Sequence, residues 1–188
     1  MATHTPDPDP RDGGNFDYTG GDVERPELVA ALDDRVDGEV RFDDYSKRLY
    51  ATDASAYEAT PIGVVMPEST ADVAAVQEYC FAEGIPVLPR GGGTSLAGQT
   101  VNEAVVLDLT DSMDEILSTD PDAETARVQA GAYVGDLNAA VEPHGLKFAP
   151  DPAWRDKSAV GGAIGNNSTG AHSLKYGKTD HYVEEAEV

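Results

Sequence analysis

Residues 88–100 read LPRGGGTSLAGQT, so a short apolar strand runs into three consecutive glycines and two hydroxyl side chains. Glycine has no Cβ, and successive backbone N–H groups can therefore turn toward one anion and form a concave nest. Arg90, Thr94 and Ser95 can add a charge and hydroxyl donors to this nest. The stretch predicts a loop that cradles phosphate, and a ligand with a pyrophosphate is the first expectation.

The residues before this loop predict a strand, a helix and a second strand. Residues 62–66 (IGVVM) are apolar and rich in β-branched side chains, and residues 85–88 resume a strand that leads into the glycines. Between them, Ser69 or Thr70 caps a helix that ends at Gly84. Further elements are predicted after the loop: strands over 105–109 and 126–130, Asp-rich turns at 110–114 and 119–124, and a helix over 134–141.

The N-terminal part differs in composition from the rest of the chain. Residues 1–22 are rich in Pro, Gly and Asp and have almost nothing to bury, which predicts a disordered acidic tail. Residues 23–48 predict a cover that contains a short helix and a second segment packed on the domain. The remaining residues, 49–188, are expected to form one domain.

The chain carries 35 acidic and 13 basic residues, for a formal net charge of −22. Such a surface repels nucleic acid, so nucleic-acid binding is not expected. It is typical of adaptation to high salt, because screening over ~3 Å at 1 M removes the self-repulsion. The charge is uneven, however: residues 125–179 hold four acidic and six basic residues, which indicates a bound anion or a neutral surface there.

The cysteine and histidine content of the sequence predicts neither a disulfide within the chain nor a zinc site. Cys80 is the only cysteine and stands in an apolar helical context, which favours a place in the core. The four histidines show no paired metal-ligand spacing, and His172 and His181 are expected to be structural or surface residues rather than general bases. The sequence contains no transmembrane stretch and no apolar secretory core, so a cytoplasmic location is expected.

Two nucleotide-binding motifs fail in the glycine loop. A G-x-G-x-x-G fingerprint starting at Gly91 ends on Leu96 instead of glycine. Residues 93–100 match a Walker A loop except that Gln99 replaces the phosphate-binding lysine. A glycine-rich hairpin without a ligand is the remaining alternative, but it does not explain why Arg90 is the only basic residue between Arg48 and Arg127.

A second glycine-rich stretch, VGGAIGNNSTGAHSLKYGK over residues 160–178, supplies a partner for the loop. Small residues there let a flat ligand approach the backbone closely. Asn166, Asn167, Ser168 and Thr169 supply neutral donors and acceptors for the polar edge of a ring. The two stretches together therefore favour one dinucleotide site.

These motifs, with YATDASAY over residues 50–57 and PDP over 150–152, resemble a family of flavoproteins. It is the family whose FAD-binding domain is shared by vanillyl-alcohol oxidase and p-cresol methylhydroxylase, in the FAD-linked oxidase branch of glycolate oxidase and D-lactate dehydrogenase. The resemblance implies an α+β fold, with a small strand-helix subdomain packed on a larger antiparallel sheet and FAD between them. The second sheet would be incomplete, because the family's FAD domain continues beyond the length of this chain.

The resemblance also implies the cofactor-binding residues. The loop backbone would wrap the FAD pyrophosphate, while residues from 150 onward would line the ribityl chain and the isoalloxazine. Some relatives carry a histidine joined covalently to the flavin at the position of Thr94, so noncovalent FAD is expected here. The expected cofactor-binding residues are Pro89, Arg90, Gly91, Gly92, Gly93, Thr94, Ser95, Leu96, Pro150, Asp151, Gly161, Gly162, Ile164, Asn166, Asn167, Ser168, Gly170 and Gly177.

The implied activity is oxidation of a 2-hydroxy acid, of the glycolate or D-lactate class, by FAD. In the family, a separate substrate domain binds the hydroxy acid and provides the proton-abstracting base, so no catalytic residue is expected within this chain. The chain is therefore read as the N-terminal flavin-binding part of such an enzyme, with an electron-acceptor or iron–sulfur module as a further partner. The alternative is a catalytically incompetent flavin-binding module that needs a partner chain.

Overall fold

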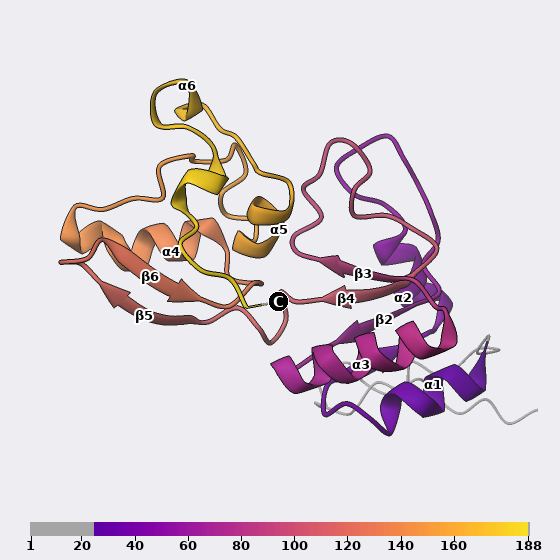
Figure 1. Ribbon diagram of the computed structural model, residues 1–188. Helices are drawn as coiled ribbons and strands as arrows, with labels where there is room; N and C mark the ends of the chain where they lie inside the picture. The colour runs from indigo at the N-terminus through magenta and orange to yellow at the C-terminus, as the bar shows by residue number, and fades with distance from the viewer. Residues whose placement is uncertain (1–24, 188) are drawn as a thin grey trace, which may run out of the picture.

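The computed structural model describes residues 25–187, so the tail predicted over 1–22 lies outside the described residues. Figure 1 shows two parts, a four-stranded sheet with its helices and a two-stranded hairpin with the C-terminal helices. In chain order, the elements are α1 (Pro26–Asp33), β1 (Glu39–Arg41), α2 (Asp44–Tyr50), β2 (Gly63–Met66), α3 (Thr70–Glu83), β3 (Val87–Arg90), β4 (Val105–Asp108), β5 (Ile116–Asp120), β6 (Thr125–Val128), α4 (Val134–Val141), the 3-10 helix η1 (Glu142–His144), α5 (Val160–Gly165), α6 (Ser173–Tyr176) and the 3-10 helix η2 (Thr179–Tyr182).

The four-stranded sheet has the order β1-β2-β4-β3. Strand β4 pairs in parallel with both neighbours, and Val106 is the register partner of Val64 in β2 and of Leu88 in β3. The predicted strand-helix-strand unit is therefore present, but β4 lies between its two strands. At the other edge, β1 pairs antiparallel with β2, so the predicted N-terminal cover contributes a strand as well as helices.

Helix α3 begins and ends where its caps predict. The Ser69 hydroxyl accepts a hydrogen bond from the Asp72 N–H at 3.2 Å, and Gly84 ends the helix in the left-handed conformation with φ 67°. The buried side of α3 carries Val76 and Cys80, which pack in one cluster with strands β2 and β4 and with helix α1. Cys80 is fully buried, as its apolar context predicts.

The hairpin part is built from β5, β6 and the helices that follow. Strands β5 and β6 pair antiparallel with an irregularity between Ile116 and Ser118. Helix α4 covers the hairpin and shares a small buried cluster with Val160 of α5. The predicted turn over 119–124 is wrong at its first two residues, because residues 119 and 120 belong to β5.

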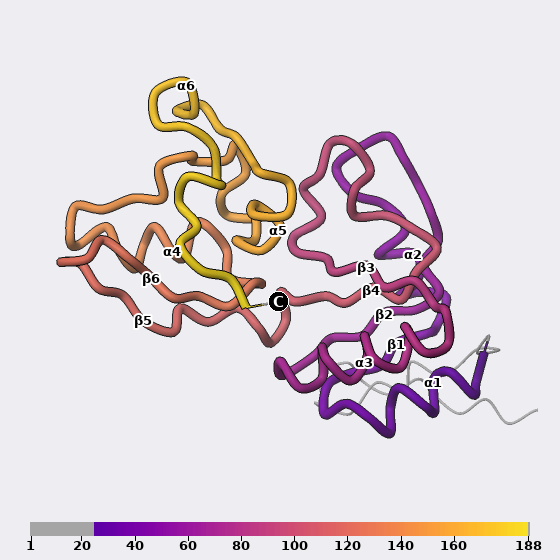
Figure 2. The backbone as a smooth tube through the Cα atoms, in the orientation of Figure 1, coloured from indigo at the N-terminus to yellow at the C-terminus, as the bar shows by residue number. Residues whose placement is uncertain are grey.

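The two glycine-rich stretches belong to different parts of the molecule, and they lie on the sides of those parts that face each other. The first follows the C-terminal end of β3, and the second forms α5, which lies on the side of the hairpin part nearest that loop (Figure 1). After η2 the chain returns along β6, as the tube in Figure 2 shows, and Arg127 donates to Glu185 at 3.3 Å. This arrangement leaves the loop and α5 free to form a common groove.

Candidate functional site

A groove open to solvent lies between the two glycine stretches. Its lining residues are Gly91, Gly92, Gly93, Thr94, Ser95, Thr100, Ser158, Ala159, Gly162, Ala163, Asn166 and Ser168. A Cβ on Gly92 would lie 1.7 Å from the Lys157 carbonyl oxygen, and a Cβ on Gly91 would lie 2.7 Å from the Ala159 Cβ. The loop thus packs directly against residues 157–159, and glycine is required for that approach.

The backbone of the loop presents a row of unused donors. Within residues 25–187, the N–H groups of residues 91–95 have no hydrogen-bond acceptor. The positive φ of Gly93, 63°, turns the chain within this row. Unpaired backbone N–H groups at a concave surface form a binding site for an anion such as a phosphate.

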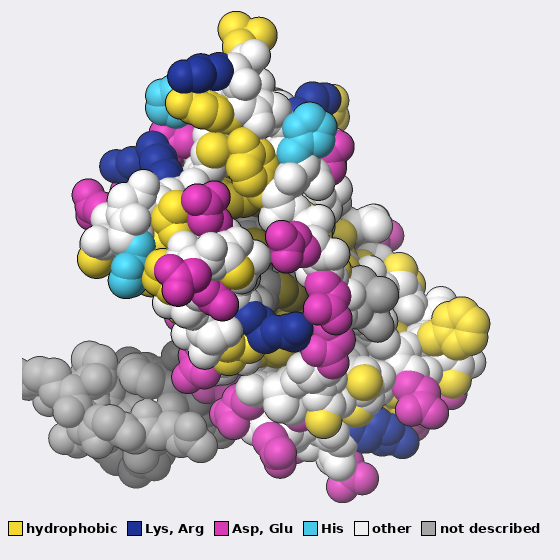
Figure 3. All heavy atoms as spheres, turned by 60° about the vertical axis from the view of Figure 1, so that its left-hand side comes forward, with side chains coloured by type: hydrophobic (Ala, Val, Ile, Leu, Met, Phe, Trp, Pro, Cys, Tyr) yellow, Lys and Arg dark blue, Asp and Glu magenta, His cyan; other side chains and the backbone are white. Residues whose placement is uncertain are grey.

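The groove has no carboxylate among its lining side chains, although the chain as a whole is strongly acidic. Figure 3 shows Asp and Glu side chains spread over much of one face of the molecule, while Lys, Arg and His are prominent toward the end that carries α6. The hydroxyls of Thr94 and Ser158 lie 3.4 Å apart and link the two walls. A phosphate can therefore enter this groove without meeting a like charge at its walls.

Arg90 does not extend into the groove, contrary to the expectation that its charge adds to the nest. Its guanidinium donates to three backbone carbonyls, those of Tyr50 at 3.1 Å, Thr100 at 3.0 Å and Thr52 at 2.9 Å. The guanidinium carbon also lies 5.1 Å from the centre of the Tyr50 ring. The side chain therefore connects the loop to the segments beside it.

Ser95 has a similar internal role. Its hydroxyl donates to the Gln99 side chain at 2.6 Å and accepts from the N–H groups of Ala97 and Gln99 at 3.2 and 3.3 Å. Gln99, which replaces the Walker A lysine, is thus part of a turn that closes the loop. The expected hydroxyl donor at Ser95 is engaged in this turn, whereas Thr94 lies at the groove with Ser158 as its hydroxyl neighbour.

Helix α5 and the residues after it form the opposite wall. Gly162 has no atom within 4 Å of the place where a Cβ would stand, so the wall is open at this residue. Asn166 and Ser168 line the groove, whereas Asn167 has φ 45° and its side chain accepts from the Asp180 N–H at 3.0 Å. The Asn167 side chain therefore holds the backbone of this wall to η2 instead of lining the groove.

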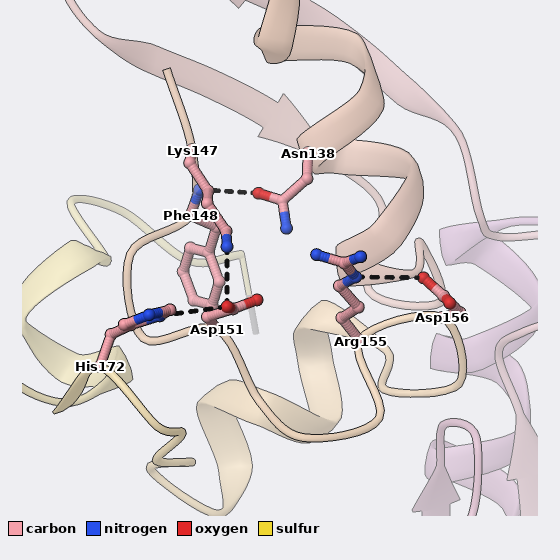
Figure 4. A network of polar contacts seen from close by, with 7 residues as sticks. All are labelled: Asn138, Lys147, Phe148, Asp151, Arg155, Asp156 and His172. Carbon is pink, nitrogen blue, oxygen red and sulfur yellow. Dashed lines mark hydrogen bonds and ion pairs between the residues drawn. The ribbon is translucent and has the colours of Figure 1, made fainter. Parts of the chain in front are cut away.

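Pro150, Asp151 and Gly170 form a cluster behind this wall. Asp151 has φ 48°, and its carboxylate accepts from Lys147 at 2.7 Å and lies 3.1 Å from His172 Nδ1 (Figure 4). The hydrogen bond from Lys147 holds the pKa of Asp151 below its ordinary value, and the charges of Lys147, His172 and Arg155 act in the same direction. A Cβ on Gly170 would lie 1.9 Å from the Asp151 carbonyl oxygen. These residues support the backbone and are not among the lining residues of the groove.

The other expected residues lie at the borders of the site. Gly161 packs on Ala130, and a Cβ there would lie 2.9 Å from the Ala130 carbonyl oxygen. Pro89 is exposed in β3, and Leu96 and Ile164 are 79% and 39% exposed. Gly177 has φ 88° and contacts the His181 ring. None of these residues lines the groove.

The sequence interpretation missed four lining residues: Thr100, Ser158, Ala159 and Ala163. Ser158 and Ala159 directly precede the second glycine stretch, and their small size is the signal that could have identified them. Their place at the groove follows from hydrogen bonds that fix this segment, since Val134 N–H donates to the Ser158 carbonyl and Val160 N–H to the Ala132 carbonyl.

Taken together, the row of free N–H groups, the neutral walls and the opening at Gly162 have the chemistry that a dinucleotide cofactor with a pyrophosphate requires. A family model described as FAD binding domain matches residues 61–188. The chain belongs to this family, and its cofactor is FAD.

Among curated proteins, the chain is similar to D-2-hydroxyglutarate dehydrogenase of Pseudomonas putida, with 38% identity over 165 residues. This match covers 85% of the chain and 16% of the relative. Glycolate oxidase subunit GlcD of Escherichia coli is 37% identical over 170 residues, which cover 89% of the chain and 34% of that protein. The chain therefore spans only 16% and 34% of the lengths of these two relatives.

Among solved structures, alkyldihydroxyacetonephosphate synthase superposes with a TM-score of 0.70 at 21% identity, covering 84% of the chain and 32% of that protein. This likeness concerns the fold, and it confirms the α+β FAD-binding fold predicted from the sequence. Within residues 25–187, no helix is long and apolar enough to cross a membrane. The same residues contain no group of three His, Cys, Asp or Glu side chains that could hold a metal ion.

Proposed function

We propose that the chain is the flavin-binding part of an oxidoreductase that oxidises a 2-hydroxy acid, and that it binds FAD noncovalently. The observation that carries the site is the row of free N–H groups over residues 91–95, which faces a wall left open at Gly162. The names of the relatives, a D-2-hydroxyglutarate dehydrogenase and a glycolate oxidase subunit, support the substrate class. D-lactate, expected from the resemblance, belongs to the same class.

Each group in the groove would have a distinct task. The N–H groups of residues 91–95 would hold the pyrophosphate, as backbone donors hold phosphate in other anion nests. Asn166 and Ser168 would offer neutral hydrogen bonds from the other wall, and Gly162 would leave room for the cofactor. Bound FAD supplies two-electron oxidation, while the residues of this chain bind and orient it. Thr94 offers a hydroxyl where a covalent relative has an imidazole, which supports noncovalent binding.

The partners and setting belong to the same proposal. Substrate-binding residues and the proton-abstracting base would lie in a region of the whole enzyme that the relatives have and this chain does not cover. An electron-acceptor module is a further partner, and the protein would act in a salt-rich cytoplasm. The net charge of −22 supports the adaptation to salt.

A second candidate is a flavin-binding module that is inactive without a partner chain. The short coverage of the relatives favours it, since the chain spans 16% of the dehydrogenase and 34% of the oxidase subunit. His172 pairs with Asp151, and His181 lies against Gly177 and 3.9 Å from Asp180, so neither histidine is assigned a catalytic role under either candidate.

The test is anaerobic reduction of the reconstituted protein. The chain is purified in molar salt, saturated with FAD, freed of unbound flavin and mixed with D-2-hydroxyglutarate, glycolate or D-lactate. Bleaching of the yellow absorbance by one of these acids would show that this chain turns over without the region that only the relatives cover, and bound flavin that none of them bleaches agrees with a base that lies outside the chain. Dithionite provides the positive control for reduction. A folded protein that retains no flavin contradicts both candidates.

A further inference from the structure

We infer that Arg90 is a positioning residue that holds the phosphate-binding loop in its binding shape without touching the cofactor. The inference rests on the FAD site proposed above, because it takes the N–H row of residues 91–95 as the phosphate site. Arg90 is the last residue of β3 and directly precedes the three glycines. It is therefore placed to fix the position at which the loop leaves the sheet.

Three of the five N–H groups of the Arg90 guanidinium donate to backbone carbonyls. Nη1 donates to the carbonyls of Tyr50 and Thr100, and Nη2 donates to the carbonyl of Thr52. These carbonyls come from the end of α2, the segment that follows it and the far end of the loop. One side chain thus joins two stretches of backbone that are distant in sequence, residues 50–52 and the end of the loop at Thr100, and it is not among the residues that line the groove.

The loop itself rests on this guanidinium. Gly93 has φ 63°, and a Cβ on it would lie 2.5 Å from Arg90 Nη2, so its backbone packs directly on the charged group. The Gly93 carbonyl accepts from the Ala54 N–H at 3.0 Å, which ties the middle of the loop to the same neighbouring segment. The conformation of the nest therefore depends on the place of the guanidinium.

Two carboxylates stabilise the assembly around Arg90. Asp108 accepts a hydrogen bond from the Tyr50 hydroxyl, and Asp53 accepts one from the Thr100 hydroxyl at 3.0 Å. Burial lowers the pKa of Arg90, while the charges of Asp108 and Asp53 act against this effect. A guanidinium remains protonated under such conditions, so the charge beneath the loop is kept.

This arrangement needs arginine in particular. A planar guanidinium reaches three carbonyls in fixed directions, whereas a lysine ammonium is a compact point charge on a flexible stem. Holding the loop before FAD binds reduces the ordering that binding would otherwise require. The inference also accounts for a basic residue at this position, the only one between Arg48 and Arg127.

The experiment compares Arg90→Lys and Arg90→Met with the wild type, with Arg127→Met as control. Arg127 is 61% exposed and contacts Glu185, so its loss removes one charge at a distance from the loop. Amide hydrogen exchange is measured on the FAD-free proteins in molar salt. A positioning role predicts roughly tenfold faster exchange of the Ala54 N–H in both Arg90 variants and no change in Arg127→Met.

FAD affinity is then measured by quenching of flavin fluorescence. Both Arg90 variants are expected to lose roughly tenfold or more in affinity, because Lys cannot replace the planar group. Substantial rescue of affinity by Lys, with unchanged exchange at Ala54, would mean direct contact with phosphate and would overturn the inference. Unchanged affinity in both variants would also overturn it. If Arg90→Met does not fold, Arg90→Lys decides by the same criteria.

The exchange measurement keeps this inference separate from the proposed function. If the wild type binds no FAD, the proposed function fails, and the exchange at Ala54 still reports whether Arg90 holds the loop. If the wild type binds FAD and the Arg90 variants show wild-type exchange, the positioning role alone fails.

Discussion

Gly162→Ala adds one methyl group to the wall of the groove that we propose for FAD. Gly162 lies in α5, lines the groove and has no atom within 4 Å of the place of a Cβ. The methyl group therefore meets no protein atom and projects into the open space at the groove. The variant tests whether that space is used by the cofactor.

The expected effects on stability and on binding have opposite signs. Alanine is favoured over glycine in a helix by about 0.5–1 kcal/mol, so the FAD-free variant should be more stable than the wild type. Overpacking by a methyl group costs about 1–3 kcal/mol, which corresponds to a loss of FAD affinity of about 5- to 150-fold. A general loss of folding would instead lower stability and binding together.

Gly165→Ala provides a matched control. Gly165 is also in α5 and also has no atom within 4 Å of a Cβ, but it does not line the groove. Urea unfolding of the FAD-free proteins and FAD titration by fluorescence quenching measure the two effects separately. Gly165→Ala should gain stability and keep its affinity. Equal FAD affinity in Gly162→Ala and the wild type would refute the placement of the cofactor at this wall.

Four other outcomes are expected. Gly92→Ala should lose about 2–4 kcal/mol in urea unfolding, since its Cβ would lie 1.7 Å from the Lys157 carbonyl. Asp151→Asn should have a lower free energy of unfolding than the wild type at neutral pH, because the pKa of Asp151 is depressed in the folded protein. The difference should shrink as the pH falls below 3.8, and parallel pH profiles of the two proteins would contradict this. Thr94→Val should lower the free energy of unfolding by at most about 1 kcal/mol, because the hydroxyl contact of Thr94 with Ser158 is long. Its flavin should remain extractable by acid. Transfer from molar to millimolar salt should reduce the circular-dichroism signal, and an unchanged signal would exclude salt dependence.

Local signals in the sequence were sufficient for several elements of the fold. Ser69 and Gly84 cap α3 at the predicted ends, and the apolar run before the glycines forms β3. Strand β5 was not predicted because only Ile116 and Leu117 are apolar in it and the rest is exposed and polar. Its partner strand, not its own pattern, stabilises it.

The site was predictable in its backbone but not in its side chains. The three consecutive glycines are a local sequence signal: Gly91 and Gly92 are needed for close approach to residues 157–159, and Gly93 packs on the Arg90 guanidinium. The direction of Arg90 depends on the carbonyls of Tyr50 and Thr52, which only the folded chain brings near. Ser158 reaches the groove for a similar reason, because α4 and α5 hold its segment in place.

We propose that the folded chain binds FAD noncovalently between its two glycine stretches. The most direct measurement is a titration of the FAD-free protein in molar salt, followed by acid precipitation of the saturated complex. We expect saturable quenching with one FAD per chain and all flavin in the acid supernatant. Folded protein that binds no FAD, or flavin that remains with the precipitate, would contradict the account.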